Sequence, residues 1–326
     1  NGKSPTQTLP KGEGFSNYAQ MKLTNEIVVQ KAKAVGFDLV GFAKAEMLEQ
    51  ESEHLQKWLD SSYQAGMDYM ERNFEKRKDV KRILPEAKSV ISLGLNYYTP
   101  DSYSNEKIKG KVSRYAWGKD YHLVIWSMLD ELEEELKKID PSFESISYVD
   151  TGPVMDKAWS VRAGIGWLGK HTNVINREIG SWFFIANIIT NYEFNYSEPI
   201  PDFCGSCTAC LDACPTSAII QEYVVDANKC ISYLTIENKN EIQEEFKEKF
   251  DNWIFGCDIC QDVCPWNQKF PVETLIKDFH PQNKELKLDD ILEMNEDEFK
   301  AKFQTSPIKR AKLTGMKRNA SHLRKH

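Results

Sequence analysis

The chain has 326 residues, of which 41% are hydrophobic and 28% are charged, and its formal net charge at pH 7 is −7. This length suits one large or two medium domains, and the acidic balance argues against a protein that binds nucleic acid over its whole surface. No apolar run approaches the roughly 18 residues of a membrane-spanning helix, so we expect no contact with a membrane. Residues 1–20 are polar and unpatterned, and we interpret them as a fusion remnant outside the fold.

The next part of the chain alternates between helical and extended patterns. Apolar residues at three- and four-residue spacing predict helices at residues 25–36, at 54–73 with a break near Gly66, and at 121–139. Short apolar runs predict strands at residues 38–43, 89–98, 146–150 and 181–190. Residues 100–111 are polar and predict a loop. Interspersed helices and strands favour an α+β layered domain over residues 21–195.

The remaining chain divides at its prolines and cysteines. Residues 195–203 carry two prolines and predict a linker, and all eight cysteines follow between residues 204 and 264. We expect a cysteine-rich domain over residues 196–270 and a helical segment over residues 271–326. Lys309 to His326 contains seven Lys or Arg residues and no acid, which permits either a phosphate-binding surface or a solvated tail.

The cysteines form one complete motif and one incomplete copy. The complete motif is CGSCTACLDACP (residues 204–215), with the C-x2-C-x2-C-x3-C-P spacing in which three thiolates bind one iron–sulfur cluster and the fourth binds a second. The incomplete copy is CDICQDVCP (residues 257–265), with Ile254 where its first cysteine would stand. Reciprocal pairing predicts a first cluster on Cys204, Cys207, Cys210 and Cys264. The second cluster then takes Cys214, Cys257, Cys260 and the remaining cysteine, Cys230.

Zinc is the alternative metal that such thiolates could bind. Zinc sites more often pair two C-x2-C units across a loop, and they have no role for the Cys-Pro ending. Because no secretory signal is apparent, metal binding in the cytoplasm is favoured over disulfides. The pattern therefore predicts two [4Fe–4S] clusters that carry electrons to a site in residues 21–195. A nucleotide cofactor is disfavoured there, since no P-loop occurs and the glycines of GIGWLGK (residues 164–170) follow no predicted strand.

Three further stretches carry a resemblance to a known family. They are SRYAWGKDYH (residues 113–122), VDTGPVMDKAWSVRAGIGWLGKHTN (149–173) and CDICQDVCPWN (257–267), and with them the chain resembles the epoxyqueuosine reductase family over about residues 21–320. The resemblance implies a nitroreductase-like layered domain that binds cobalamin, followed by a two-cluster ferredoxin-like domain. It also implies the reaction, a two-electron removal of the epoxide oxygen from epoxyqueuosine at the wobble position of tRNA. The C-terminal helical segment then resembles the start of a truncated helical-repeat region.

The resemblance also implies roles for individual residues. Asp150 would donate a proton to the oxygen of the opening epoxide, although an Asx-turn is its alternative interpretation. The residues implied in cobalamin binding are Asn73, Ser113, Arg114, Tyr115, Asp150, Lys170, Asn173 and Val174. The residues expected to contact the tRNA are Lys157, Arg162 and Asn176, together with the basic C-terminal end. From the residues alone, Arg114 could instead be a surface salt-bridge partner and Asn73 a helix cap.

One motif for cobalt ligation is incomplete. Asp120, Tyr121 and His122 begin the pattern D-x-H-x-x-G, but Ile125 stands in the place of its glycine. We therefore expect that His122 does not bind cobalt through that motif.

Two other classes of protein remain open at this point. A reductive dehalogenase shares cobalamin and two clusters, and an electron-carrier module would need no cofactor pocket in the first domain. The family resemblance favours a cytoplasmic monomer that acts on a tRNA anticodon loop and takes electrons from an external flavodoxin or ferredoxin.

Overall fold

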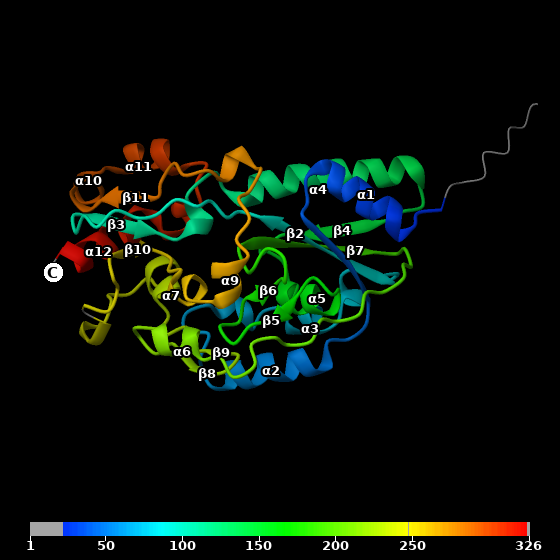
Figure 1. Ribbon diagram of the computed structural model, residues 1–326, viewed down its shortest axis with the longest axis horizontal. Coiled ribbons are helices and arrows are strands. Elements are labelled where there is room, and N and C mark those ends of the chain that lie inside the picture. The colour runs from blue at the N-terminus through cyan, green and yellow to red at the C-terminus, as the bar shows by residue number, and fades with distance from the viewer. Residues whose placement is uncertain (1–21, 247, 325–326) are drawn as a thin grey trace, which may run out of the picture.

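The computed structural model describes residues 22–246 and 248–324, and the predicted fusion remnant at residues 1–20 lies outside this part. The chain is a mixed α+β protein, as predicted, with two lobes built on separate sheets (Figure 1). No helix in the described ranges is long and apolar enough to cross a membrane.

A four-stranded sheet forms the centre of the first lobe. Its strands lie in the order β1-β2-β7-β4, and each neighbouring pair is antiparallel. Their bounds are β1 Leu39–Lys44, β2 Ser89–Asn96, β4 Ser145–Tyr148 and β7 Phe183–Thr190. Every residue of β2 is buried, because helices cover both faces of the sheet. The four predicted strands are confirmed, and the mostly apolar sequences of β2 and β7 fit strands that helices cover on both faces.

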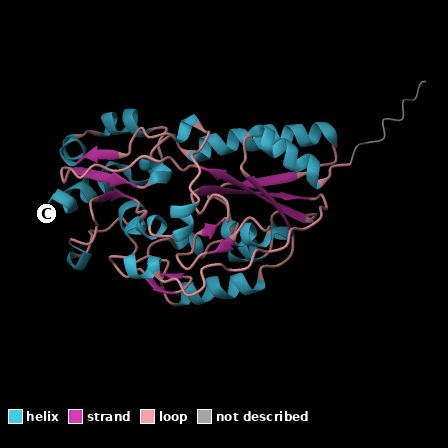
Figure 2. Cartoon of the chain, viewed as in Figure 1, coloured by secondary structure: helices cyan, strands magenta, loops and turns pink. Residues whose placement is uncertain are grey.

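Helices lie on both sides of this sheet (Figures 1 and 2). The helices on one side are α1 (Asn25–Val35) and α4 (Tyr121–Ile139), both confirmed as predicted. The helices on the other side are α5 (Asp156–Arg162), α2 (Glu49–Asp60) and α3 (Phe74–Lys78). The helix predicted over residues 54–73 is therefore wrong beyond Asp60. Ser62 and Ala65 adopt positive φ angles of 57° and 53°, which a continuing helix does not allow.

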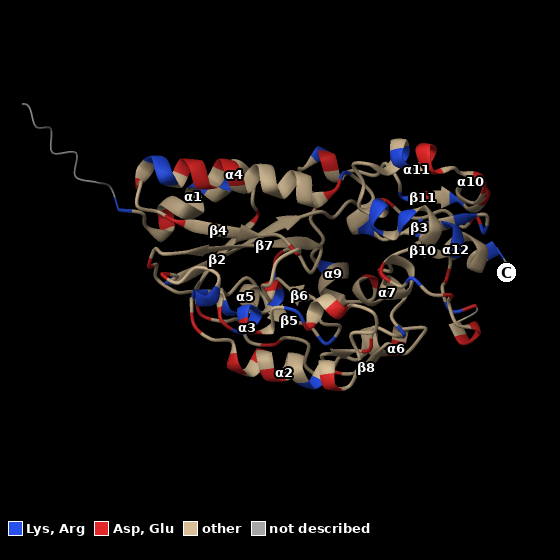
Figure 3. Cartoon of the chain, turned by 180° about the vertical axis from the view of Figure 1, so that it is seen from behind, with Lys and Arg blue, Asp and Glu red and all other residues tan. Residues whose placement is uncertain are grey.

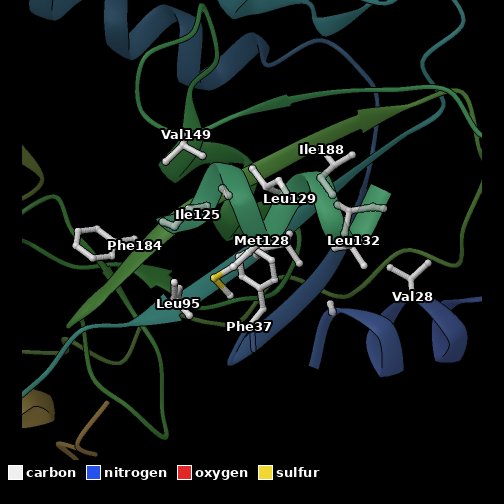
Figure 4. Close-up of a cluster of buried hydrophobic side chains, with 14 of the residues drawn as sticks. Val28, Phe37, Leu95, Ile125, Met128, Leu129, Leu132, Val149, Phe184 and Ile188 are labelled. Atoms are coloured by element: carbon white, nitrogen blue, oxygen red, sulfur yellow. The ribbon is translucent and has the colours of Figure 1, made fainter. Parts of the chain in front are cut away.

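The buried side of α4 ties the first lobe together. Ile125, Leu129 and Leu132 are fully buried, and they pack in one cluster with Val28 of α1 and Phe184 of β7 (Figure 4). Burying one such side chain contributes roughly 1.5–3 kcal/mol. The helix begins where the Asp120 carboxylate accepts a hydrogen bond from the backbone N–H of His122 (3.1 Å). This start fixes Tyr121, the first residue of α4, at the site described below.

A three-stranded sheet in the order β10-β3-β11 forms the second lobe. β3 (Lys109–Val112) lies parallel to β10 (Trp253–Phe255) and antiparallel to β11 (Glu285–Lys287). The helices of this lobe are α7 (Ile231–Ile236), α10 (Leu288–Glu293), α11 (Glu296–Phe303) and α12 (Lys312–Arg324). The loop predicted over residues 100–111 is wrong at its end. The Lys-Gly-Lys sequence of β3 has no apolar alternation, and the strand forms because partners from the far end of the chain flank it.

The cysteine-rich segment lies between the two lobes and has short elements only. Its helices are α6 (Ala209–Ala213), α8 (Ile259–Asp262) and α9 (Pro265–Lys269), and its hairpin pairs β8 (Ile219–Gln221) with β9 (Val224–Val225). A second hairpin, β5 (Trp167–Leu168) with β6 (Val174–Ile175), comes from the first lobe and packs against α9. The predicted domain limits at residues 195 and 270 stay predictions.

Candidate active site and iron–sulfur centres

Four thiols surround one cavity in the cysteine-rich segment. The cavity has a volume of about 240 Å³, and its cysteines are the predicted first quartet, Cys204, Cys207, Cys210 and Cys264. Cys264 is the N-cap of α9, and Pro265 occupies the first helical position, where a missing N–H costs no hydrogen bond. The Cys-Pro ending therefore points one thiol into the cavity and starts a helix at the same time.

The second quartet gathers around Cys260. Burial raises the pKa of the Cys260 thiol, and the nearby thiolates of Cys230 and Cys214 raise it further. Burial likewise raises the pKa of Cys257, with further contributions from Cys260 and Cys230. The charge of Cys210 also acts on Cys260, so the two quartets are neighbours. The structure thus brings Cys230 to the group that lacks a fourth thiol.

Ile254 cannot take that place. It lies in β10 with no exposed surface, and its side chain packs against Gly110 of β3. Cys230 instead stands at the N-cap of α7. In the described part of the chain, no three Cys, His, Asp or Glu side chains lie close enough to hold a single metal ion. Thiols spaced around a cavity are what a cuboidal iron–sulfur cluster requires.

Asp258, inside the incomplete cysteine motif, forms hydrogen bonds with the segment at residues 113–122. Asp258 is buried, and its carboxylate accepts hydrogen bonds from the Ser113 hydroxyl and from the Arg114 backbone N–H (2.7 Å). The Arg114 guanidinium donates to the carbonyl of Thr99 and lies 4.4 Å from the ring centre of Trp117. Arg114 is thus a buried cation, and its interpretation as a surface salt-bridge partner is wrong. Its side chain and that of Ser113 are engaged within the second lobe.

Asp150 follows β4 on a loop between the two lobes. Its φ angle is 57°, a left-handed conformation that aspartate tolerates better than most residues. The Tyr121 hydroxyl donates to Oδ2 of Asp150 (2.7 Å), and the Tyr121 ring stacks on Phe184 with a centre-to-centre distance of 4.3 Å. No donor in the described residues reaches Oδ1 of Asp150, whose side chain is exposed. The structure therefore shows no Asx-turn at Asp150 and leaves one carboxylate oxygen open to a substrate.

A buried arginine that the sequence did not single out holds this loop. The Arg77 guanidinium donates to the carbonyls of Gly152 (3.4 Å), Val154 (3.5 Å) and Tyr69 (3.2 Å). Gly152 is required there, because a Cβ atom at this position would lie 1.9 Å from the ring of Tyr148. Only the fold could reveal this contact, since Arg77 stands in a run of charged residues that looks like an ordinary exposed surface.

Lys157 is within electrostatic range of both Asp150 and the second quartet. The Lys157 ammonium donates to Oδ1 of Asn173 (3.1 Å) and interacts electrostatically with Asp150, Cys260 and Cys230. The side chain keeps exposed surface, yet desolvation by the surrounding protein lowers the pKa of its ammonium. Lys157 therefore links the surroundings of Asp150 electrostatically with the thiols of the second quartet.

Residues of the second lobe reach the same region. The ring of Tyr115 lies 6.2 Å from that of Tyr121, and burial followed by the charge of Asp150 raises the pKa of the Tyr115 hydroxyl. Arg310 forms an ion pair with Glu237 (2.8 Å), and its charge also interacts with Asp150. The second lobe thus reaches the surroundings of Tyr121 and Asp150.

Several predicted site residues have their side chains engaged elsewhere. Lys170 is buried and pairs with Glu222 (2.6 Å), beside the first quartet. Val174 is buried in β6, and Asn176 donates to the Ile165 carbonyl (2.6 Å). Arg162 is held by Glu51 (2.7 Å) and Glu46 (3.0 Å). Asn73 is exposed at the start of α3, where its side chain makes no capping hydrogen bond. Roles of these residues in binding stay predictions.

Asp156 is a second carboxyl beside Asp150, and it should make stability depend on pH. Burial, and then the charge of Asp150, raise the pKa of Asp156 to about 7, although Asn187 donates to it (2.7 Å) and Arg77 opposes the shift. From roughly pH 4 to pH 7 the unfolded carboxyl is ionised while the folded one keeps its proton, so the free energy of unfolding falls as the pH rises. The Asp156→Asn variant has no carboxyl group at this position, so its free energy of unfolding does not fall for this reason.

We therefore expect Asp156→Asn to increase the melting temperature more at pH 8 than at pH 5. The measurement is thermal unfolding of the cluster-loaded protein at both pH values. Asp130→Asn, on the exposed side of α4, is the matched control. A melting-temperature difference that is the same at pH 5 and pH 8 would contradict the assignment.

Fold and site together define a class of protein. Residues 203–267 match the sequence model of a 4Fe-4S double cluster binding domain, so this is an iron–sulfur redox protein of mixed α+β fold. Residues 77–151 match the family described as epoxyqueuosine reductase QueG. The epoxyqueuosine reductase of Cellulophaga algicola is 46% identical over 301 residues, which are 92% of this chain and 98% of that protein. The chain belongs to the epoxyqueuosine reductase family and is an oxidoreductase.

Solved structures agree with this membership. An epoxyqueuosine reductase crystallised with an epoxyqueuosine-modified tRNA-Tyr stem loop is 35% identical, with a TM-score of 0.86 over 91% of this chain and 80% of that chain. The enzyme of Bacillus subtilis, in a structure whose catalytic aspartate loop is swung out of the active site, is 34% identical with a TM-score of 0.85 and the same coverage. The membership favours the reductase interpretation over the dehalogenase and carrier interpretations.

Proposed function

We propose that this protein reduces epoxyqueuosine to queuosine at the wobble position of tRNA, with cobalamin and two [4Fe–4S] clusters as cofactors. The observation that carries the proposal is the position of Lys157, whose ammonium interacts electrostatically with Asp150 and with the thiols Cys260 and Cys230 of the second quartet. A site around Lys157 could receive electrons from the second cluster and a proton from Asp150. Membership of the family and the tRNA complex of a relative support the substrate.

The cysteines would hold the clusters as two quartets. The first binds to Cys204, Cys207, Cys210 and Cys264, around the cavity of about 240 Å³. The second binds to Cys214, Cys230, Cys257 and Cys260, of which Cys230 and Cys260 interact with Lys157. Electrons would therefore enter at the first cluster and leave from the second, since only the second borders Lys157 and Asp150.

Cobalamin would lie near Lys157 and Asp150. Tyr115, Asp150 and Asn173 would hold it there, because each is half-buried or exposed and each contacts or interacts with Lys157 or Asp150. When bound, a reduced corrin cobalt supplies the strong nucleophile that attack on an epoxide requires. We expect no cobalt ligation by His122 through the D-x-H-x-x-G motif, because Ile125 stands in the place of its glycine. The His122 Nδ1 pairs with Asp120 (2.8 Å) at the start of α4.

The protein's own groups would manage the protons. Conversion of an epoxide to an alkene consumes two electrons and two protons and releases water. Asp150 would donate one proton through Oδ1 to the departing oxygen, while the Tyr121 hydroxyl holds Oδ2 and orients the carboxyl group. Arg77 would keep the loop in place through the Gly152 and Val154 carbonyls. The swung-out aspartate loop of the Bacillus subtilis relative supports a catalytic role for this loop.

The tRNA would present an unstacked anticodon-loop nucleotide to the site, with Lys157 at the place where it binds. The basic C-terminal end offers fewer unpaired charges than its sequence suggests. Lys309 pairs with Asp120 (2.7 Å) and Arg324 pairs with Asp289 (3.0 Å). Figure 3 shows acidic residues of α10 and α11 close to the basic residues of α12.

We infer that the external electron donor is a flavodoxin or ferredoxin and that the enzyme works as a cytoplasmic monomer.

The test is a conversion assay with defined components. The protein is loaded with iron, sulfide and cobalamin and then incubated with a reductant and a stem loop that carries epoxyqueuosine. We expect queuosine in the digested nucleosides, and no conversion when cobalamin is omitted. Absence of queuosine from the complete mixture, or full conversion without cobalamin, would refute the proposal.

A further inference from the structure

Exposed aromatic rings lie at the mouth of the first cluster cavity. Phe203 and Trp266 line the cavity, and their ring centres are 6.1 Å apart. Phe270 stacks on Trp266 at 5.4 Å and continues the row outward. Phe203 is 37% exposed and Phe270 is 41% exposed. We call Phe203, Trp266 and Phe270 the aromatic patch. A row of large apolar rings in solvent is typical of a surface that binds another protein.

The patch lies on the electron-entry side of the protein. Cys204 and Cys207 of the first quartet are only partly buried, and both line the cavity that the patch borders. The second quartet instead lies within electrostatic range of Lys157. Figures 1 and 3 view the molecule from opposite sides, and both place α9 beside β5 and β6. A carrier seated on the patch would therefore meet the first cluster before the second.

Two cations flank the aromatic patch. The Arg177 guanidinium lies 3.9 Å from the ring centre of Phe203, and Lys269 directly precedes Phe270. Both side chains are exposed, and neither forms an ion pair with any described residue, whereas nearby Lys170 is neutralised by Glu222. The nearby acid Asp202 is engaged by the Tyr223 hydroxyl. The patch thus has, at its edge, two cations that form no ion pair with a described residue.

We propose that the aromatic patch, with Arg177 and Lys269, is the docking surface for an acidic one-electron carrier protein of the flavodoxin or ferredoxin class. The inference rests on the proposed function, which requires an external donor. In each encounter the reduced carrier loses one electron and the first cluster gains it, and two encounters supply one turnover. The apolar rings exclude water from the contact, and the two cations steer the acidic partner toward it.

Cluster reduction measures this docking directly. Iron–sulfur-loaded protein, without cobalamin or tRNA, is mixed rapidly with reduced flavodoxin or reduced ferredoxin, and the loss of visible cluster absorbance is followed. We expect Lys269→Glu and Arg177→Glu each to lower the second-order rate constant by about tenfold at low salt, and by much less at high salt. Phe270→Ser should lower it at both salt concentrations. Lys300→Glu, an exposed charge reversal on α11, is the matched control.

Reduction by dithionite, a small reductant that needs no docking surface, should proceed at the wild-type rate in every variant. The proposal is overturned if both carriers fail to reduce the wild type, if Lys269→Glu and Arg177→Glu leave the carrier rate unchanged, or if Lys300→Glu slows it equally. Because the readout needs neither cobalamin nor tRNA, a failure of docking is distinct from a failure to convert epoxyqueuosine.

Discussion

Replacing Cys230 with serine should remove one cluster and abolish turnover. We expect the iron content to fall from about eight to about four atoms per chain, because each [4Fe–4S] cluster needs four protein ligands and the second quartet has no spare thiol. Electrons would then stop at the first cluster, since the thiols that interact with Lys157, near Asp150, belong to the second. The measurements are iron and sulfide content, and conversion of epoxyqueuosine in the stem loop.

Two further variants decide whether Cys230 is a ligand or only a buried side chain. Lys229→Ala changes the adjacent residue, whose side chain is 46% exposed, and should keep about eight iron atoms. Adding Ile254→Cys to Cys230→Ser should not restore the cluster, because position 254 packs against Gly110 in the sheet of the second lobe. Retention of about eight iron atoms by Cys230→Ser would show that the second cluster uses another ligand.

Local patterns predicted the parts of the fold whose buried positions follow a simple spacing or an apolar run in the sequence. The apolar spacing of α4 gave both of its ends, and the runs of β2 and β7 gave the centre of the sheet. The sheet of the second lobe could not be predicted in this way. β3 is a short polar segment, and its partners β10 and β11 come from the far end of the chain. A strand made by distant partners leaves little periodicity in its own sequence.

The candidate site shows the same division. Cysteine spacing predicted seven of the eight cluster thiols, because the spacing limits which thiols can face one cluster, and Cys230 was assigned as the one cysteine left over. The motif around Asp150 likewise predicted a carboxylate at the site. Sequence could not predict that the Ser113 hydroxyl and the Lys170 ammonium are engaged by Asp258 and Glu222. The direction of a side chain depends on tertiary contacts, and for the same reason Arg77 was missed.

The Asp150→Asn variant should show the largest loss that leaves the clusters intact. The amide keeps the size of the carboxyl group and can still accept from Tyr121, but it cannot release a proton to the departing oxygen. We expect the rate of epoxyqueuosine conversion to fall by roughly 10²- to 10⁴-fold, the usual contribution of a positioned acid. Iron content and reduction of the clusters by dithionite should match those of the wild type.

Matched variants separate proton donation from the architecture of the loop. Tyr121→Phe keeps the ring that stacks on Phe184 and removes only the hydroxyl that orients Asp150, so its conversion rate should fall less than that of Asp150→Asn. Asp130→Asn, an exposed carboxylate on α4, should convert epoxyqueuosine at the wild-type rate. Conversion by Asp150→Asn at the wild-type rate would contradict the assignment of Asp150 as the proton donor.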